Sequence, residues 1–253
     1  MWNGDYFFLL SNLVKKDFRL RYRNMSLGVF WSLLNPLVTM VVLTFVFTKV
    51  LPTNQVNFPV FVLCGLVPFN FFAMAWGTGT GSLLENAHII KRVPVPREVV
   101  PISSVLGNCL HLLIQIGLLL AFVLVFGLGV NRYWLWLPYV WGMEVLFVCG
   151  LALMFSAANV FIRDTRYVVE SANTILFWMV PVFYPFNIIP AQFRDLYQLN
   201  PLAALVLALR NILMEAVPPP TTLLVKLTLS SLAVLGIGLL VFRKAREHFY
   251  DYL

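Results

Sequence analysis

The stretch Val50–Leu84 reads VLPTNQVNFPVFVLCGLVPFNFFAMAWGTGTGSLL and contains no charged residue. A helix of about 20 apolar residues crosses the roughly 30 Å hydrocarbon core of a bilayer. This stretch is therefore long enough to span a membrane. Further uncharged runs lie on both sides of it: Asn24–Thr48, Val99–Asn131, Val145–Ile162, Ser171–Phe193 and Leu227–Phe242.

The composition of the 253-residue chain agrees with these runs. Hydrophobic residues make up 60% and charged residues 11%, whereas soluble domains have roughly 45–50% and 25%. So few charges exclude a soluble globular enzyme and predict an all-α polytopic membrane protein. Cys64, Cys109 and Cys149 all lie in apolar runs without a pairing spacing, so we expect them to pack as small hydrophobic residues.

The uncharged runs predict six transmembrane helices, and the positions of basic residues predict their orientation. The expected spans are about 27–49, 60–83, 100–128, 134–160, 171–189 and 222–242. An even number places both termini on one side, and that side holds most of the 18 Lys and Arg residues. The positive-inside rule therefore predicts cytoplasmic termini. The net charge of +7 follows from this topology, and no nucleic-acid partner is expected.

The N-terminal segment 1–26 predicts an amphipathic helix that precedes the transmembrane domain at 27–253. No cleavable signal is expected, because the apolar patch Tyr6–Leu10 is too short. A helix of this kind lies in the membrane interface and contacts lipid headgroups. Its apolar residues recur every three or four positions, and its basic residues mark another face: Phe7, Leu10, Val14, Phe18, Tyr22 and Met25, against Lys16, Arg19 and Arg23.

The fifth apolar run is interrupted by proline. Pro181, Pro185 and Pro190 break a helix, and the weakly polar stretch Ala191–Val217 follows them. This stretch is too apolar for an ordinary external loop and too broken for a span. It predicts a re-entrant pair of short outer helices between spans five and six.

Motifs of catalysis are missing from the chain. It has no G-x-x-x-x-G-K-[ST], G-x-S-x-G, H-E-x-x-H or C-x-x-C sequence. We therefore expect no catalytic, cofactor-binding or metal-binding residue in this chain, and its three histidines are scattered.

Polar residues inside the expected spans form a second group of candidates. Glu144 falls near the middle of span four, and His111 and Gln115 belong to a polar stripe on span three. An intramembrane acid is a functional candidate, but such groups also hydrogen-bond neighbouring helices. A Glu144–His111 pair is one possible arrangement, and it leaves open a proton-coupled secondary transporter that uses both residues as a relay.

Two short loops on the cytoplasmic side are dense in charge. They are Glu85–Glu98 and Arg163–Tyr167. Each is either a turn that faces lipid headgroups or a docking site for a cytoplasmic partner such as an ATPase.

The chain resembles the membrane subunits of ABC-2-type exporters of polysaccharides (O-antigen, capsule and teichoic acid). The resemblance covers nearly the whole sequence and depends on the order of several short motifs. These are RYR (21–23), LGVFW (27–31), NP (35–36), GLVPFNFF (65–72), KRVPVP (91–96), NVFIRD (159–164), FWMVP (177–181) and YQLNP (197–201).

The resemblance implies a permease subunit in a bacterial plasma (inner) membrane that moves lipid-linked polysaccharide outward. It implies a homodimer bound to two copies of a separate ABC ATPase subunit, which would hold ATP and magnesium. The two charged loops would then contact the ATPase through Glu85, Asn86, His88, Lys91, Arg92, Arg163, Asp164 and Arg166.

Aromatic residues supply candidates for the substrate path. An aromatic ring packs on the apolar face of a sugar, although most rings in a membrane protein face lipid or the interface. By the resemblance, the first and fifth spans line the path. The candidates are Phe30, Trp31, Phe177, Trp178 and Tyr184.

Overall fold

The computed structural model describes residues 6–22, 30–51, 53, 55–92 and 96–252, and these residues form only helices and the turns between them. The principal helices are α1 (Tyr6–Tyr22), α2 (Phe30–Phe45), α3 (Phe58–Glu85), α4 (Ala87–Arg92), α5 (Val99–Val125), α6 (Leu137–Phe161), α7 (Thr165–Met179), α8 (Ala191–Leu199), α9 (Pro201–Leu213), α10 (Thr221–Ala245) and α11 (Phe249–Tyr252). The short helices η1 (Val46–Val50), η2 (Arg132–Trp136), η3 (Phe186–Ile188) and η4 (Arg246–His248) join or extend them.

Five helical segments in the described part of the chain are long and apolar enough to cross a membrane. They are Phe30–Val50, Phe58–Glu85, Val99–Val125, Arg132–Phe161 and Thr221–His248. They correspond to the first four predicted spans and the last one, although residues 27–29 of the first lie outside the described residues. A sixth crossing would be counted only if α8 and α9, which meet at 101°, formed one broken span.

The predicted span at 171–189 is wrong in its boundaries. The helix there, α7, begins at Thr165 and ends at Met179. Its 15 residues cover about 22 Å at 1.5 Å per residue, less than a hydrocarbon core of roughly 30 Å. Pro181 has no N–H group to continue the helix, so α7 ends before an extended Val180, and the chain then bends at residues 182–184.

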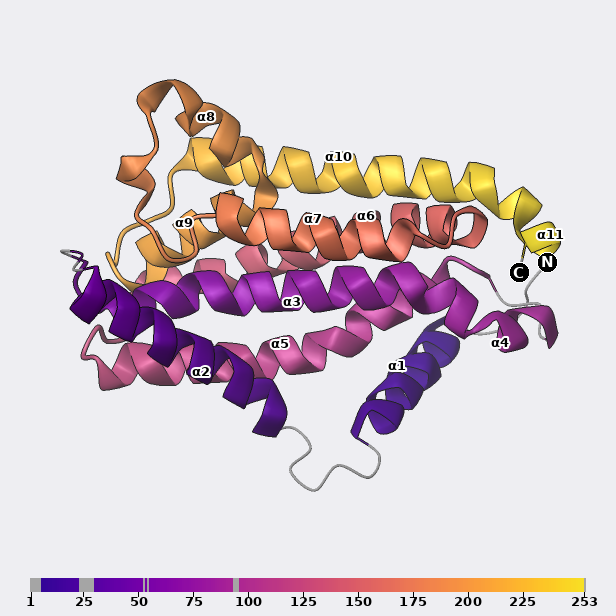
Figure 1. The fold of residues 1–253 in the computed structure, drawn as a ribbon, viewed down its shortest axis with the longest axis horizontal. Coiled ribbons are helices and arrows are strands. Elements are labelled where there is room, and N and C mark those ends of the chain that lie inside the picture. Colours follow the sequence, from indigo (N-terminus) through magenta and orange to yellow (C-terminus); the bar gives the residue numbers. More distant parts are fainter. Residues whose placement is uncertain (1–5, 23–29, 52, 54, 93–95, 253) are drawn as a thin grey trace.

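The long helices run side by side along the longest axis of the molecule, with α3 in the middle (Figure 1). Helix α3 is apolar on all sides and most of it is buried, which is the pattern expected of a helix enclosed by others. It packs against α2, α5, α6, α7 and α9.

Glycines allow two of these helices to approach closely. A Cβ atom built at Gly238 of α10 would lie 2.2 Å from the carbonyl oxygen of Gly150 in α6, so the two backbones touch. Small residues permit this kind of contact between membrane helices.

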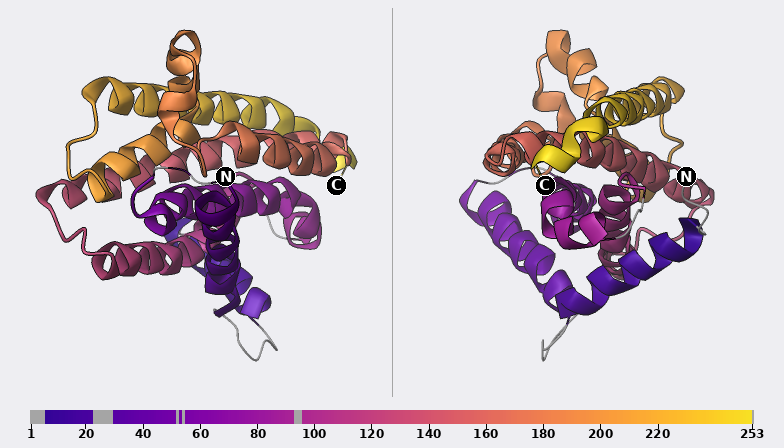
Figure 2. Two further views of the ribbon diagram at one scale, coloured as in Figure 1. Left: turned by 60° about the vertical axis from the view of Figure 1, so that its left-hand side comes forward. Right: turned by 90° about the vertical axis from the view of Figure 1, so that its right-hand side faces the viewer.

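The two ends of the bundle differ. Helices α1, α4 and α11 gather at one end, and α8 and α9 lie at the other (Figure 1). Helix α1 crosses α5 obliquely, whereas α8 stands away from the bundle (Figure 2). Almost every residue of α9 is buried. Helix α9 therefore closes one end of the bundle, and α8–α9 form a bent pair of short helices where re-entrant helices were predicted.

Candidate functional site

The first charged loop is attached to the N-terminal helix. Asn86 ends α3, and its side-chain amide donates a hydrogen bond to the Ser82 carbonyl at 2.8 Å. Its Oδ1 in turn accepts a hydrogen bond from Lys16 Nζ of α1. Asn86 thus joins α1 to the loop from a half-buried position.

Other predicted coupling residues of this loop project outward. Glu85, His88 and Lys91 are exposed, so their side chains are available to a partner. The side chain of Arg92 and residues 93–95 lie outside the described part of the structure. Among the predicted coupling residues of this loop, Asn86 uses its side chain for hydrogen bonds within the chain.

The residues after α10 fold back onto the same loop. Arg97 donates a hydrogen bond to the carbonyl of Arg246, and its guanidinium lies 5.8 Å from the centre of the Phe249 ring. Arg246 Nη1 lies 3.8 Å from Glu98 Oε1. Two basic side chains and one acidic side chain therefore join the loop to residues 246–249.

Phe249 also reaches the second loop. It has no exposed surface, and its ring centroid is 5.9 Å from that of Phe161 at the end of α6. It belongs to a small core, here called the end cluster, separate from the main core. The end cluster consists of Leu83, Ile90, Val100, Leu153, Ala157, Val160, Phe242 and Phe249. Its members come from both sides of the first loop and from the end of α6, which leads into the second loop, so the cluster attaches the first loop to that helix end.

The second charged loop leads directly into α7. Arg163, Asp164 and Arg166 are exposed, and the Asp164 carbonyl accepts hydrogen bonds from the amides of Tyr167 and Val168. The only partner shown for the Arg166 side chain in the described structure is Glu170, 3.3 Å away. A displacement of this loop would therefore be passed to α7.

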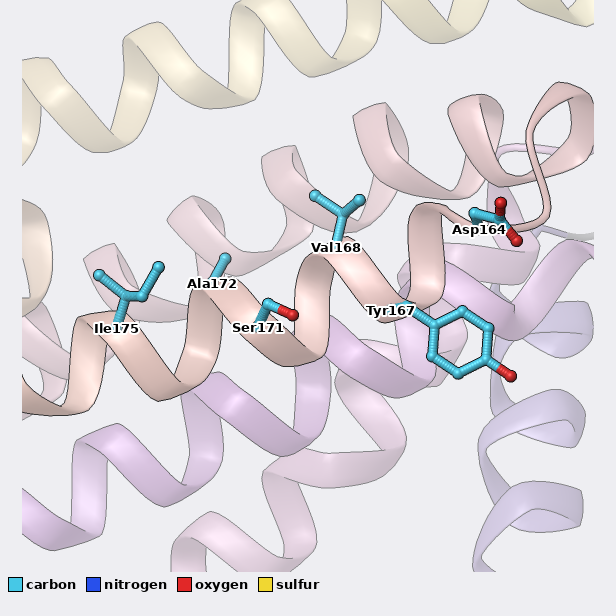
Figure 3. A pocket seen from close by; sticks show the side chains of 6 residues that line it. All are labelled: Asp164, Tyr167, Val168, Ser171, Ala172 and Ile175. Atoms are coloured by element: carbon cyan, nitrogen blue, oxygen red, sulfur yellow. The ribbon is translucent and has the colours of Figure 1, made fainter.

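One face of α7 borders a surface hollow of about 620 Å³. The hollow begins at the second loop and follows the helix (Figure 3). Its lining residues recur every three or four positions: Asp164, Tyr167, Val168, Ser171, Ala172 and Ile175. A second hollow, of about 280 Å³, lies further along α7 on another side of the helix, where Asn173, Thr174 and Phe177 face Phe69 of α3. The first hollow therefore leaves one face of α7 open from Asp164 to Ile175.

Three predicted path residues meet at the end of α7. The ring centroids of Phe177 and Trp178 are each less than 6 Å from that of Phe183, and the Tyr184 ring lies 5.4 Å from it. The Tyr184 hydroxyl donates to the Met179 carbonyl at 2.7 Å, which fixes the turn after α7. Trp178 is 64% exposed, so this aromatic cluster has an open edge.

The other two path candidates lie elsewhere. Phe30 and Trp31 begin α2, and each is about half exposed (49% and 50%). No ring contact joins them to Phe183 or its neighbours among the described residues. The structure therefore does not bring the five candidates into one ladder within a single chain.

The polar stripe on α5 holds helices together. Asn108 donates to Thr78 Oγ1 of α3 at 2.9 Å, and Gln115 donates to the Ser32 carbonyl of α2 at 3.0 Å. His111 lies between them and is buried. Interhelical hydrogen bonds of this kind are the structural role considered for the stripe.

The structure does not form the predicted Glu144–His111 pair. Glu144 is 1% exposed, and neither of its carboxylate oxygens has a hydrogen-bond partner in the described structure. It lies close enough to Cys109 to interact with it electrostatically. Cys109 and His111 are two positions apart on α5, so their side chains lie on different sides of that helix.

A buried arginine was missed at the sequence level. Arg210 is not among the predicted site residues, yet it lies inside the bundle on α9 and is 5% exposed. Its Nη2 donates to the Val182 carbonyl at 2.8 Å and to the Phe61 carbonyl at 3.4 Å. A single arginine in an otherwise apolar stretch is the signal that could have identified it.

The comparisons with known proteins agree with this geometry. A model of the ABC-2 type transporter family matches residues 9–214. The O-antigen export system permease protein RfbA of Klebsiella pneumoniae is 32% identical over 99% of this chain and 96% of its own length. The protein of the same name from Myxococcus xanthus is 29% identical over 96% and 94%. The polysialic acid transport protein KpsM of Escherichia coli is 24% identical over 93% and 92%.

Proposed function

Because the chain belongs to the ABC-2 type transporter family, we propose that it is the permease subunit of an ATP-driven exporter of lipid-linked polysaccharide. Relatives that match over nearly their whole length are named for the export of O-antigen or the transport of polysialic acid. The observation within this chain that best supports the proposal is the end cluster. It joins the first charged loop to the end of α6, and the second charged loop then connects α6 to α7.

The energy source in this proposal is a separate ABC ATPase, present in two copies, that binds ATP and magnesium. It docks on the exposed side chains of the two loops, with Glu85, His88 and Lys91 on one and Arg163 and Asp164 on the other. Closure of the two ATPases displaces the loops. The end cluster makes the loops move together, and the start of α7 moves with them.

The substrate path lies between two copies of the chain. Adjacent helix axes are roughly 8–10 Å apart, which leaves no room for a hydrated sugar chain inside one packed subunit. The open face of α7 and the larger hollow along it would line such a path in a homodimer. Phe177, Trp178 and Tyr184 stand at the end of that face, where rings can stack on sugars.

The proposed setting is a bacterial inner membrane with both termini in the cytoplasm. Basic residues cluster at the end formed by α1, α4 and α11, and such residues mark the cytoplasmic side. The bent pair α8–α9 then closes the outer end.

Copurification tests the proposal. The chain is isolated from native membranes with its partners, and ATP hydrolysis of the complex is measured. The expected partner is a protein with a P-loop, present in a 1:1 ratio to this chain. Exchange of the exposed charges Lys91 and Arg163 for Ala should release the partner, whereas exchange of Arg132 and Arg194, exposed or half-buried at the opposite end, should not. A chain that retains no ATPase under any mild extraction contradicts the proposal.

A further inference from the structure

Arg210 is a buried cation held by neutral groups. Besides the Val182 and Phe61 carbonyls, its Cζ lies 3.4 Å from the centre of the Phe61 ring. No ion pair of Arg210 is found in the described part of the chain. It occupies the last turn of α9, where the partial negative charge of the helix terminus favours a cation. The Glu215 carboxylate also acts on this cation through its charge, but the groups in direct contact are carbonyls, a ring face and a helix end.

These partners come from three separate elements. Phe61 belongs to α3, Val182 to the segment after α7, and Arg210 to α9. This segment lies directly on α3, because a Cβ atom at Gly65 would be 2.7 Å from Val182 Cα. Arg210 therefore attaches α9 to the segment after α7, at the point where this segment contacts α3.

The contact is incomplete in one respect. A guanidinium has five N–H groups, and Nε and Nη1 of Arg210 have no hydrogen-bond partner among the described residues. Buried polar groups without partners are rare and costly. If α9 moved away from Val182, water could hydrogen-bond to Nε and Nη1. This hydration would offset part of the free energy that is lost with the Val182 hydrogen bond. The closed arrangement is stabilised and yet reversible.

We propose that Arg210 is the positioning residue that holds the α8–α9 pair closed on the broken fifth span, and that export requires it to release Val182. The proposal rests on the proposed function, because it treats the α8–α9 end as the exit. It assigns to one side chain the contact that must break when the exit opens.

Cys64 is a built-in reporter of this contact. It lies next to Gly65, has no exposed surface, and is close enough to Arg210 to interact with it electrostatically. We expect a hydrophilic maleimide to reach its thiol faster when the α8–α9 end opens. Replacing Cys109 and Cys149 with Ala leaves Cys64 as the single thiol of the chain.

The test measures maleimide labelling of Cys64 from the outside of right-side-out membrane vesicles that contain the full chain with its native partners and have been emptied of nucleotide and substrate. Arg210→Lys keeps the charge but cannot maintain the guanidinium geometry. It should speed labelling about tenfold, the factor that corresponds to one lost hydrogen bond to a charged group. Gly65→Ala should act in the same direction from the α3 side, because its methyl group displaces Val182.

Two matched variants serve as controls. Arg194 also donates to two backbone carbonyls, those of Ile189 and Asn187, but both residues are close to Arg194 in sequence. Arg194→Lys should therefore leave labelling unchanged. Gly77 of α3 has open space at its Cβ position, so Gly77→Ala should also have no effect.

Labelling at the wild-type rate in both Arg210→Lys and Gly65→Ala, at equal protein in the membrane, overturns the proposal. Equal acceleration in Arg194→Lys overturns it as well, because that result indicates general loosening of the outer end. The resting measurement needs neither ATP nor polysaccharide. A negative labelling result therefore does not contradict the export function. If export is not observed, the labelling result can still be interpreted.

Discussion

The ring of Phe249 lies 5.9 Å, centroid to centroid, from the ring of Phe161. This contact brings residues after α10 against the end of α6, where the second charged loop begins. The same ring faces Arg97 of the first loop. One buried side chain therefore contacts the first proposed docking loop and the end of the helix that leads into the second.

Phe249→Ala should separate the two loops. Large-to-small exchanges of a buried Phe cost about 3–5 kcal/mol, which exceeds what the exposed Arg246–Glu98 pair can supply. Amide hydrogen exchange in α4 should then accelerate at least about 100-fold, and ATP hydrolysis should continue with little export. Phe193→Ala, at a largely exposed ring of the opposite end, is the control. Unchanged exchange in α4 would contradict the role given to Phe249.

Gly238→Ala should prevent α6 and α10 from packing. The added methyl group would lie 2.2 Å from the Gly150 carbonyl oxygen, and overpacking of this kind costs about 1–3 kcal/mol or more. The amount of protein extracted as a monodisperse species should fall, and its thermal unfolding should shift to lower temperature. Gly236→Ala on the same helix meets nothing within 4 Å and should be neutral or slightly stabilising, since Ala favours a helix over Gly. Equal behaviour of the two variants would show that the helices do not touch at Gly150.

Glu144→Gln should leave ATP-driven export intact. The structure shows no hydrogen bond to either carboxylate oxygen, so the amide removes no contact and is less costly to bury than a charge. Thermal stability should stay the same or rise. Loss of transport at normal stability would instead support a proton relay through Glu144.

The Asp195–Lys226 pair should make the position of α8 sensitive to acid. Lys226 Nζ lies 2.8 Å from Asp195 Oδ1, and this hydrogen bond together with the charge of Lys226 lowers the pKa of Asp195. Because the pKa is lower in the folded chain, the contribution of the pair is complete above the ordinary pKa of Asp. It is lost as the pH falls through the lowered value.

Hydrogen exchange in α8 measures this effect. Exchange in α8, corrected for the intrinsic pH dependence, should increase at acid pH in the wild type and should be insensitive to pH in Asp195→Asn. Lys226 also donates to Gln198 at 2.8 Å, so the variant should keep α8 partly attached. An acid effect of the same size in Asp195→Asn would assign the sensitivity to another group.

The sequence predicted the fold well where uncharged runs decide it. Val50–Leu84 contains α3, and the four other long runs contain or overlap α2, α5, α6 and α10. The predicted fifth span began at residue 171, after the start of α7, because the charges of Arg166 and Glu170 suggested a loop. These two residues instead pair with each other on the first turns of α7. Pro181 correctly marked the break.

The site was predictable only in part. Charge density identified the two loops, but the Arg97–Arg246 contact joins residues 149 positions apart, and no local pattern encodes such a contact. Arg210 was missed for the same reason, because its partners Phe61 and Val182 are distant in sequence. Glu144 and His111 were paired by depth alone, although side-chain direction around α5 decides which neighbour each residue faces.

Transport of a labelled lipid-linked polysaccharide in membrane vesicles that contain the chain and its copurifying ATPase tests the central claim most directly. Movement is measured with ATP, and separately with a pH gradient in the absence of ATP. The account predicts transport with ATP and magnesium, no transport on the pH gradient alone, and no transport with an ATPase subunit that binds but cannot hydrolyse ATP. Transport driven by the pH gradient alone would contradict it.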